Sequence, residues 1–90
     1  MKTIHLTIYG IVQGVFFRSG AKQEADLLKI KGWIKNTFEG TVECVAQGEE
    51  GALEKFVQWC KKGPTAAVVK KIDIKHSQET ELFSSFEVIR

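Results

Sequence analysis

The sequence predicts an α+β fold in which two helices cover one face of an antiparallel sheet. Two segments, residues 21–31 and 49–62, repeat apolar residues at helical spacing. Strand-like runs precede, separate and follow them, which gives the order β, α, β, β, α, β with a short extra strand at the end. Two strand–helix–strand units with right-handed crossovers interleave into one sheet, which is the arrangement of the ferredoxin-like α/β sandwich.

The first strand is predicted over residues 3–9, where apolar and polar residues alternate. Its apolar face comprises Ile4, Leu6 and Ile8. The first helix is predicted over residues 21–31, because its apolar residues fall at i, i+4 and i+7. The residues at this spacing are Ala21, Ala25 and Leu28. Gly32 follows two lysines and is the predicted stop signal of this helix.

The second half of the chain begins with a predicted β-hairpin of residues 33–37 and 41–47, with a glycine turn between them. A second helix follows, with acidic residues at its start, two lysines at its end and Gly63-Pro64 closing it, as the helix dipole favours. Its predicted buried residues are Leu53, Phe56, Val57 and Cys60. Residues 67–75 and 83–89 are the last predicted strands, with a polar loop at residues 77–81.

Length and composition indicate a single domain over residues 1–90 with one modest core. No apolar run approaches the roughly 20 residues that span a bilayer, and the alternating N-terminus does not match a signal peptide. We therefore expect a cytoplasmic protein that makes no membrane contact. The net charge of +2 suits an anionic ligand but falls short of a nucleic-acid-binding surface. Cys44 and Cys60 are expected to be buried free thiols, with a disulfide as the alternative.

The stretch from Tyr9 to Arg18 is the first candidate site. Gly10 and Gly14 allow a tight turn and close approach to a ligand. Arg18 follows where a helix should begin, and free N–H groups, the helix dipole and a guanidinium together favour an anion such as phosphate. The alternative is that Arg18 is a solvent-facing residue whose charge opposes the helix dipole.

Asn36 is the second candidate. The predicted strand directions bring the end of its strand to the same edge of the sheet as residues 10–18. The alternative is that its amide satisfies a backbone group beside the hairpin. Phe16 and Phe17 are expected in the core rather than in a base-stacking platform, and no histidine has a partner at metal-ligand spacing, so no metal site is expected.

Two sequence motifs resemble the signatures of the acylphosphatase family. Residues 9–18, Tyr-Gly-Ile-Val-Gln-Gly-Val-Phe-Phe-Arg, are similar to the family loop Gly-x-Val-Gln-Gly-Val-x-Phe-Arg. Residues 32–36, Gly-Trp-Ile-Lys-Asn, followed by Gly-Thr-Val at 40–42, resemble the second signature. The resemblance spans nearly the whole chain, with one departure: the family commonly has glycine where this chain has Lys29.

The resemblance implies hydrolysis of a small-molecule acyl phosphate to carboxylate and phosphate, without a metal or other cofactor. It implies that Asn36 orients the attacking water and that Arg18, with the backbone N–H groups of the loop, binds the phosphoryl group. The implied loop residues are Gln13, Gly14, Val15, Phe16, Phe17 and Arg18. A domain of this size is expected to act as a monomer.

Three other interpretations remain open. The same fold serves RNA-recognition domains, but these need exposed aromatic residues on the two central strands, and Tyr9 is the only aromatic residue in the predicted strands 3–9 and 41–47. We therefore expect no nucleic-acid partner. An inactive relative would bind anions without turnover, although both Arg18 and Asn36 are present. Similar domains also form parts of larger carbamoyl-transfer proteins.

Overall fold

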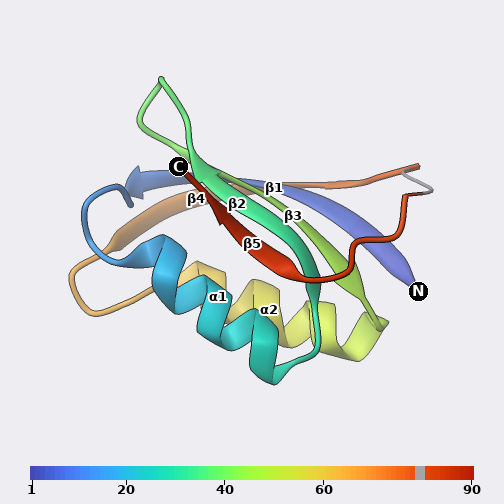
Figure 1. Cartoon of the computed structure of the whole chain (residues 1–90). Helices are drawn as coiled ribbons and strands as arrows, with labels where there is room; N and C mark the ends of the chain where they lie inside the picture. The colour runs from blue at the N-terminus through green and yellow to red at the C-terminus, as the bar shows by residue number, and fades with distance from the viewer. Residues whose placement is uncertain (79–80) are drawn as a thin grey trace.

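A computed structural model describes residues 1–78 and 81–90 of the chain (Figure 1). Seven elements follow one another along the described residues: β1 (Lys2–Ile11), α1 (Phe17–Leu27), β2 (Lys31–Asn36), β3 (Val42–Gly48), α2 (Glu50–Lys62), β4 (Val68–His76) and β5 (Phe86–Ile89). The order confirms the predicted succession of strands and helices. Residues 79 and 80, within the predicted polar loop, lie outside the described residues.

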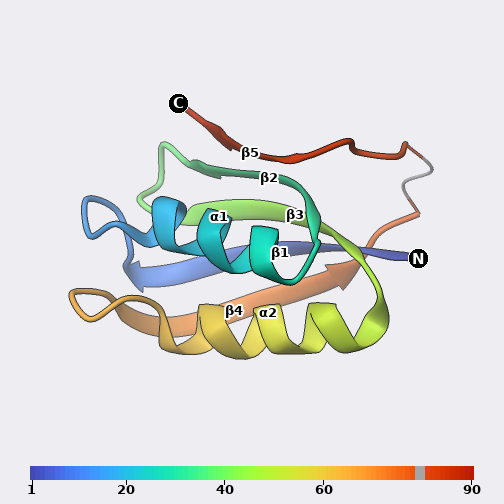
Figure 2. The ribbon, with the colours of Figure 1, turned by 60° about the horizontal axis from the view of Figure 1, so that its bottom comes forward.

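The five strands form one sheet in the order β4-β1-β3-β2-β5 (Figure 2). The first four pair antiparallel, as predicted. The prediction of a wholly antiparallel sheet is wrong at one edge, because β5 pairs parallel with β2 and makes the sheet mixed. The chain after β4 crosses to the opposite edge of the sheet, and this crossover sets the direction of β5.

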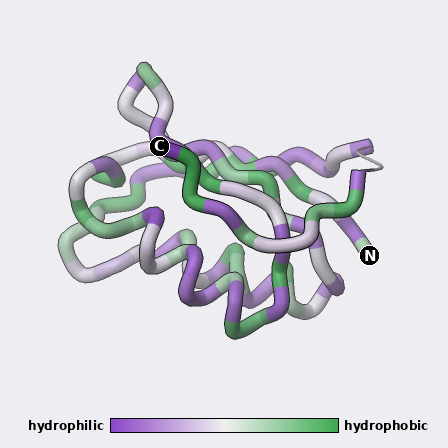
Figure 3. Tube along the Cα trace, viewed as in Figure 1, coloured by the Kyte–Doolittle hydropathy of each residue, from purple (hydrophilic) through white to green (hydrophobic). Residues whose placement is uncertain are grey.

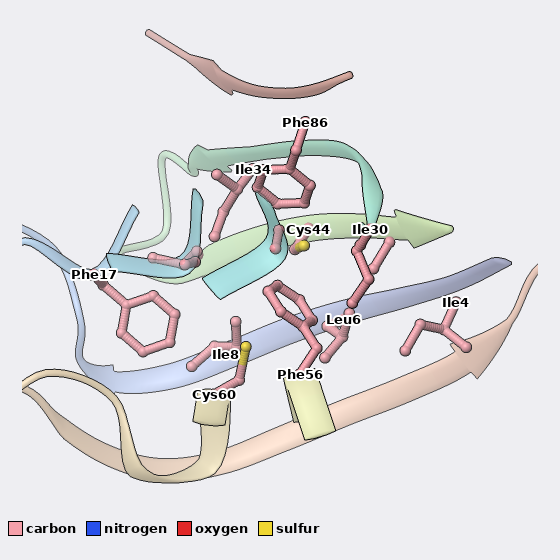
Figure 4. Close-up of a cluster of buried hydrophobic side chains, with 14 of the residues drawn as sticks. Ile4, Leu6, Ile8, Phe17, Ile30, Ile34, Cys44, Phe56, Cys60 and Phe86 are labelled. Carbon is pink, nitrogen blue, oxygen red and sulfur yellow. The ribbon is translucent and has the colours of Figure 1, made fainter. Parts of the chain in front are cut away.

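Both helices cover the same face of the sheet and enclose the core against it (Figure 2). The largest fully buried side chains come from every layer of this sandwich and include Leu6, Ile8, Phe17, Ile34, Phe56 and Phe86 (Figure 4). Phe86 attaches the edge strand β5 to the core, since its ring packs edge-on against Phe56 of α2 at 5.8 Å between centroids. Burial of these apolar surfaces supplies the main stabilisation of the fold.

The first helix lies four residues earlier than predicted. It begins at Phe17 rather than residue 21, and it ends at Leu27. Lys29 then adopts a left-handed φ of 60°, so the chain turns there instead of at Gly32. Gly32 lies inside β2, where an added Cβ would stand 1.9 Å from the carbonyl oxygen of Val45. Its glycine therefore serves a close approach between strands and not a helix end.

The second helix agrees closely with the sequence pattern, and three of its four predicted apolar residues are buried: Leu53, Phe56 and Cys60. Gly63 ends it with a φ of 70°. Figure 3 shows hydrophilic and hydrophobic segments alternating along both helices, as expected for helices with one face on the core. Cys44 and Cys60 are buried free thiols, as predicted, and burial raises the pKa of each. In the described part of the chain, no helix has the length and apolar character to span a bilayer.

Candidate active site

Strand β1 delivers the chain to one end of the sheet through a β-bulge. Its pairing with β4 shifts register between Tyr9 and Gly10. Gly10 has a φ of 130°, and an added Cβ would lie 2.0 Å from the carbonyl oxygen of Val68. The prediction that Gly10 belongs to the turn is therefore wrong: it remains in the strand, where only glycine permits this approach of the β4 backbone.

The loop between β1 and α1 turns through two left-handed residues, Gly14 with a φ of 75° and Phe16 with a φ of 67°. Around Gly14 the space is open, since an added Cβ would meet nothing within 4 Å. Such a conformation is strained for phenylalanine, and strain of this kind is concentrated at functional sites. Left-handed residues in a short loop also turn successive N–H groups toward a common point, as in anion-binding nests.

The N–H groups of this loop and of the first helical turn are free to bind a ligand. The first hydrogen bond of α1 runs from the N–H of Gly20 to the carbonyl of Phe16 at 3.1 Å. Among the described residues, no N–H of residues 14–19 donates to a backbone carbonyl, and no side chain caps the helix. Unpaired donors at a helix N-terminus attract anions.

Arg18 lies in the first turn of α1, where its exposed guanidinium is oriented by the edge strand. Its Nη1 donates to the carbonyl oxygen of Ile89 in β5 at 3.3 Å. The first turn contains no acidic residue that would neutralise it. The remaining guanidinium donors therefore stay available for a ligand.

Asn36 is the last residue of β2, opposite Val42 at the start of β3. Its Oδ1 is buried and has no hydrogen-bond partner among the described residues. A buried acceptor without a partner costs free energy, which makes this atom a ready acceptor for a water or a ligand donor. The alternative that Asn36 satisfies a local backbone group gains no support, since Thr37 and Thr41 make the hydrogen bonds that close the hairpin.

Gln13 ties the loop to the strand end that carries Asn36. Its Nε2 donates to the carbonyl oxygens of Thr37 and Thr41, each at 2.9 Å. These bonds fix the loop against the β2–β3 hairpin across 24 and 28 residues of sequence. The sequence identified Gln13 as a loop residue, but its side-chain role was not predicted because the hairpin carbonyls come together only in the fold.

Arg18 lines two adjoining hollows. The loop hollow, of about 340 Å³, is lined by Val12, Gly14, Phe16, Phe17, Arg18, Ser19, Val88 and Arg90. The edge hollow, of about 310 Å³, is lined by Arg18, Lys35, Asn36, Ile89 and Arg90. The structure therefore brings Arg18 and Asn36 to one hollow, as the predicted strand directions require.

The contribution of β5 and of Arg90, which follows it, to the site is not evident from the sequence. Val88, Ile89 and Arg90 line these hollows because β5 runs parallel to β2 and its last residue, Ile89, pairs with Lys35, the residue before Asn36. The alternation of Phe86 and Val88 is sufficient to predict a strand. It does not indicate which edge the strand joins, so its place at the site was not predictable.

The two phenylalanines of the loop differ, and the prediction that both lie in the core is wrong for one of them. Phe17 is buried and packs edge-on against Trp59 of α2 at 5.4 Å between centroids. Phe16 remains 79% exposed and lines the loop hollow. Phe16 has a left-handed backbone with a φ of 67°, whereas Phe17 is the first residue of α1.

Outside these hollows, Tyr9 lies on the uncovered face of the sheet. Its hydroxyl donates to Asp73 at 3.1 Å, and this bond raises the pKa of Tyr9. The Nζ of Lys71 lies 5.1 Å from its ring centroid. In the described residues, no group of three or more His, Cys, Asp or Glu side chains is arranged to hold a metal ion.

Comparisons with known proteins identify the family to which this chain belongs. The model of the acylphosphatase family matches residues 4–88. An acylphosphatase of Thiobacillus denitrificans is 42% identical over 87 residues, which cover 97% of this chain and 96% of that protein. The crystal structure of the acylphosphatase from Bacillus subtilis is 37% identical, with a TM-score of 0.96 over the whole of both chains. An acylphosphatase structure from Coxiella burnetii is 38% identical, with a TM-score of 0.92 over 98% of this chain and 92% of that one.

Proposed function

Because the chain belongs to the acylphosphatase family, whose members hydrolyse acyl phosphates, we propose that its loop and Arg18 hold the phosphoryl group while Asn36 orients the attacking water. The carboxyl–phosphate bond is then cleaved to give a carboxylate and inorganic phosphate. Phosphoryl transfer depends mainly on positioning and on electrostatic stabilisation of the equatorial oxygens. The residues at this site supply both.

Binding of the phosphoryl group is assigned to Arg18 and to the backbone N–H groups of the loop residues. These are Gln13, Gly14, Val15, Phe16, Phe17 and Arg18. The free donors of the loop and first helical turn support this assignment. A guanidinium can contact two phosphate oxygens at once, and the helix dipole adds to the attraction.

The observation that carries the proposal is the partnerless, buried Oδ1 of Asn36 beside Arg18. A rotation of the Asn36 amide turns this oxygen toward the edge hollow, where a water donates one O–H to it and directs a lone pair at phosphorus. The bond between phosphorus and the acyl oxygen breaks, and the bonding pair leaves with the carboxylate. The protons of the water remain on the phosphate product.

The leaving group explains why the site needs no general acid. A carboxylate has a pKa of about 4, so it departs at neutral pH without being protonated. Arg18, the N–H donors and an oriented water are therefore sufficient for the reaction.

The complete site comes from one chain, which supports action as a monomer and as a single domain over residues 1–90. The two free thiols support a reducing compartment such as the cytoplasm. The mass in solution, measured by light scattering after size-exclusion chromatography, tests the monomer. A mass twice the 10.1 kDa of the chain would contradict it.

The experiment that tests the mechanism measures benzoyl phosphate hydrolysis in excess EDTA by the wild-type protein and by Asn36→Ala. We expect metal-independent turnover in the wild type and a fall in kcat of about 10²–10³-fold in the variant, as for loss of one aligned polar group. Inorganic phosphate should still bind to Asn36→Ala, because its ligands are unchanged.

Gln58→Ala is the matched control, since it removes an exposed amide from α2 away from both hollows. It should retain full turnover. Near-normal turnover in Asn36→Ala would reject the role of Asn36. If neither protein turns over while both remain folded, the chain is an anion-binding domain.

A further inference from the structure

Phe16 is the residue of the loop that the phosphoryl site does not explain. Binding phosphate requires only its backbone N–H, yet the position carries a large aromatic side chain in a left-handed conformation. In the family signature this is one of the positions marked x, so the motif itself does not demand phenylalanine. The side chain is 79% exposed and contributes little to the core.

The location of Phe16 is the second observation. It lines the loop hollow together with two apolar residues, Val12 directly after β1 and Val88 in β5. This hollow adjoins the edge hollow, since Arg18 and Arg90 line both, and Asn36 lines the edge hollow but not the loop hollow. Gly14 leaves open space beside it.

The in-line geometry of phosphoryl transfer connects these facts. The attacking and leaving oxygens lie on opposite sides of phosphorus. A water held by Asn36 in the edge hollow therefore directs the acyl group of the substrate away from Asn36. The loop hollow adjoins the edge hollow at Arg18 and Arg90 without including Asn36, so it is the space that remains for the acyl group, and Phe16 and Val88 line it.

We propose that Phe16 is a specificity-determining residue that recognises an apolar, aromatic acyl group of the substrate. This inference rests on the proposed function of the same site. An aromatic acyl group gains from ring–ring contact in addition to the apolar area that it buries. Arg18 and the loop N–H groups hold the phosphoryl end in either case, so the ring of Phe16 acts on the choice of acyl group.

The test compares kcat/KM for benzoyl phosphate with kcat/KM for acetyl phosphate, which carry the same phosphoryl group. The quantity measured is the ratio of the two constants in each variant relative to the wild type, since this cancels the different intrinsic reactivities. Phe16→Ala should lower the ratio about tenfold, the loss expected for one aromatic contact. Phe16→Trp keeps an aromatic ring and should restore the ratio to within twofold.

Phe38→Ala is the control for removing an exposed aromatic side chain elsewhere. Phe38 lies in the turn between β2 and β3, is fully exposed and lines neither hollow. It should leave both rate constants and their ratio unchanged. A non-reacting pair, benzoylphosphonate and acetylphosphonate, gives the same comparison as inhibition constants and should show the same tenfold change.

The outcomes separate this inference from the proposed function. If the wild type hydrolyses both substrates and Phe16→Ala leaves their ratio within twofold, the assignment of Phe16 is overturned and the proposed function stands. An equal loss on both substrates also overturns it, because the ring would then support the loop alone. Hydrolysis of neither substrate by the wild type overturns the proposed function and this inference together.

Discussion

The two helices of this protein are ended in opposite ways. Helix α2 has an acidic residue, Glu50, in its first turn, two lysines in its last turn and a glycine after it. Helix α1 has no acidic residue in its first turn and no basic residue in its last turn, while neither helix has a side-chain cap. Helix α1 begins instead with a left-handed phenylalanine and an arginine whose charge opposes the dipole.

This difference indicates that the N-terminus of α1 has less favourable local interactions than that of α2 because it forms part of the binding site. The start of α1 is held by tertiary packing, since Phe17 is buried against Trp59 of α2. An added Cβ on Gly63 would lie 3.0 Å from the ring of Phe17, so the end of α2 leaves room for the start of α1. A helix whose charged residues match its dipole thus supports one whose charged residues do not. Natural proteins break local rules mainly at functional sites, and α1 does so at its N-terminus.

Of the variants that test this difference between the helices, Arg18→Ala should have the largest effect on catalysis. Removing the guanidinium should lower kcat/KM for benzoyl phosphate by about 10³–10⁵-fold, the range reported for arginines that stabilise a transferring phosphoryl group. The free energy of unfolding should change by less than about 1 kcal/mol. The lost hydrogen bond to Ile89 is exposed, and the removal of a charge that opposes the dipole offsets it.

Glu50→Ala in the first turn of α2 is the matched control for Arg18→Ala. It removes a favourable dipole contact and the exposed ion pair with Lys2 at 3.2 Å. Stability should fall by about 0.5–1 kcal/mol, while kcat/KM stays unchanged. Stability is measured by urea denaturation. A large loss of stability in Arg18→Ala would show that the charge of Arg18 stabilises the fold. It would contradict the inference that this charge serves binding at the expense of stability.

The second prediction uses Cys60, which lies in the buried face of α2, as a measure of how that helix opens. Burial raises the pKa of this thiol, so little thiolate forms at pH 8 in the folded state. In a Cys44→Ala variant, Cys60 should react with iodoacetamide at least about 10³-fold more slowly than in urea. A reaction rate within tenfold of the rate in urea would mean that α2 opens locally. Helix α2 would then not be the stable element that supports the start of α1.

The same contrast explains how much of the fold was predictable from the sequence. Helix α2 could be predicted at both ends because its sequence signals are local and agree with one another. The antiparallel pairing of the first four strands followed from the order and direction of the strands. The position of Asn36 near Arg18 followed from them too. These features depend on periodicity and topology, which a sequence carries directly.

The features that could not be predicted depend on contacts between distant segments. The start of α1 was placed four residues late because Phe17 resembles a loop residue until it packs on Trp59. The contact between Phe86 and Phe56 attaches β5 to the core beside β2, and the crossover after β4 sets its parallel direction. The bonds from Gln13 to two hairpin carbonyls likewise exist only in the folded chain.

The smallest expected effect concerns the C-terminal end of α1, where the chain closes with a Schellman motif. The N–H of Ile30 donates to the carbonyl of Ala25 at 2.8 Å, and the N–H of Lys29 donates to that of Asp26 at 3.2 Å. The motif places Lys29 at the left-handed position where glycine is favoured, with a φ of 60°. Lys29 is exposed, so its side chain adds little packing to offset the strained backbone.

Lys29→Gly should therefore stabilise the protein by about 0.5–1 kcal/mol, because glycine avoids the steric cost of the left-handed conformation. Lys61→Gly in the last turn of α2 should have the opposite sign and destabilise it by about 1 kcal/mol, since that residue is within a right-handed helix. Urea denaturation of both variants measures the difference. Both lie away from the hollows, so kcat/KM should stay at the wild-type value. Destabilisation by both substitutions would show that contacts of the Lys29 side chain offset its backbone strain. The C-terminal end of α1 would then not be a second place where this helix is less stable than its backbone allows.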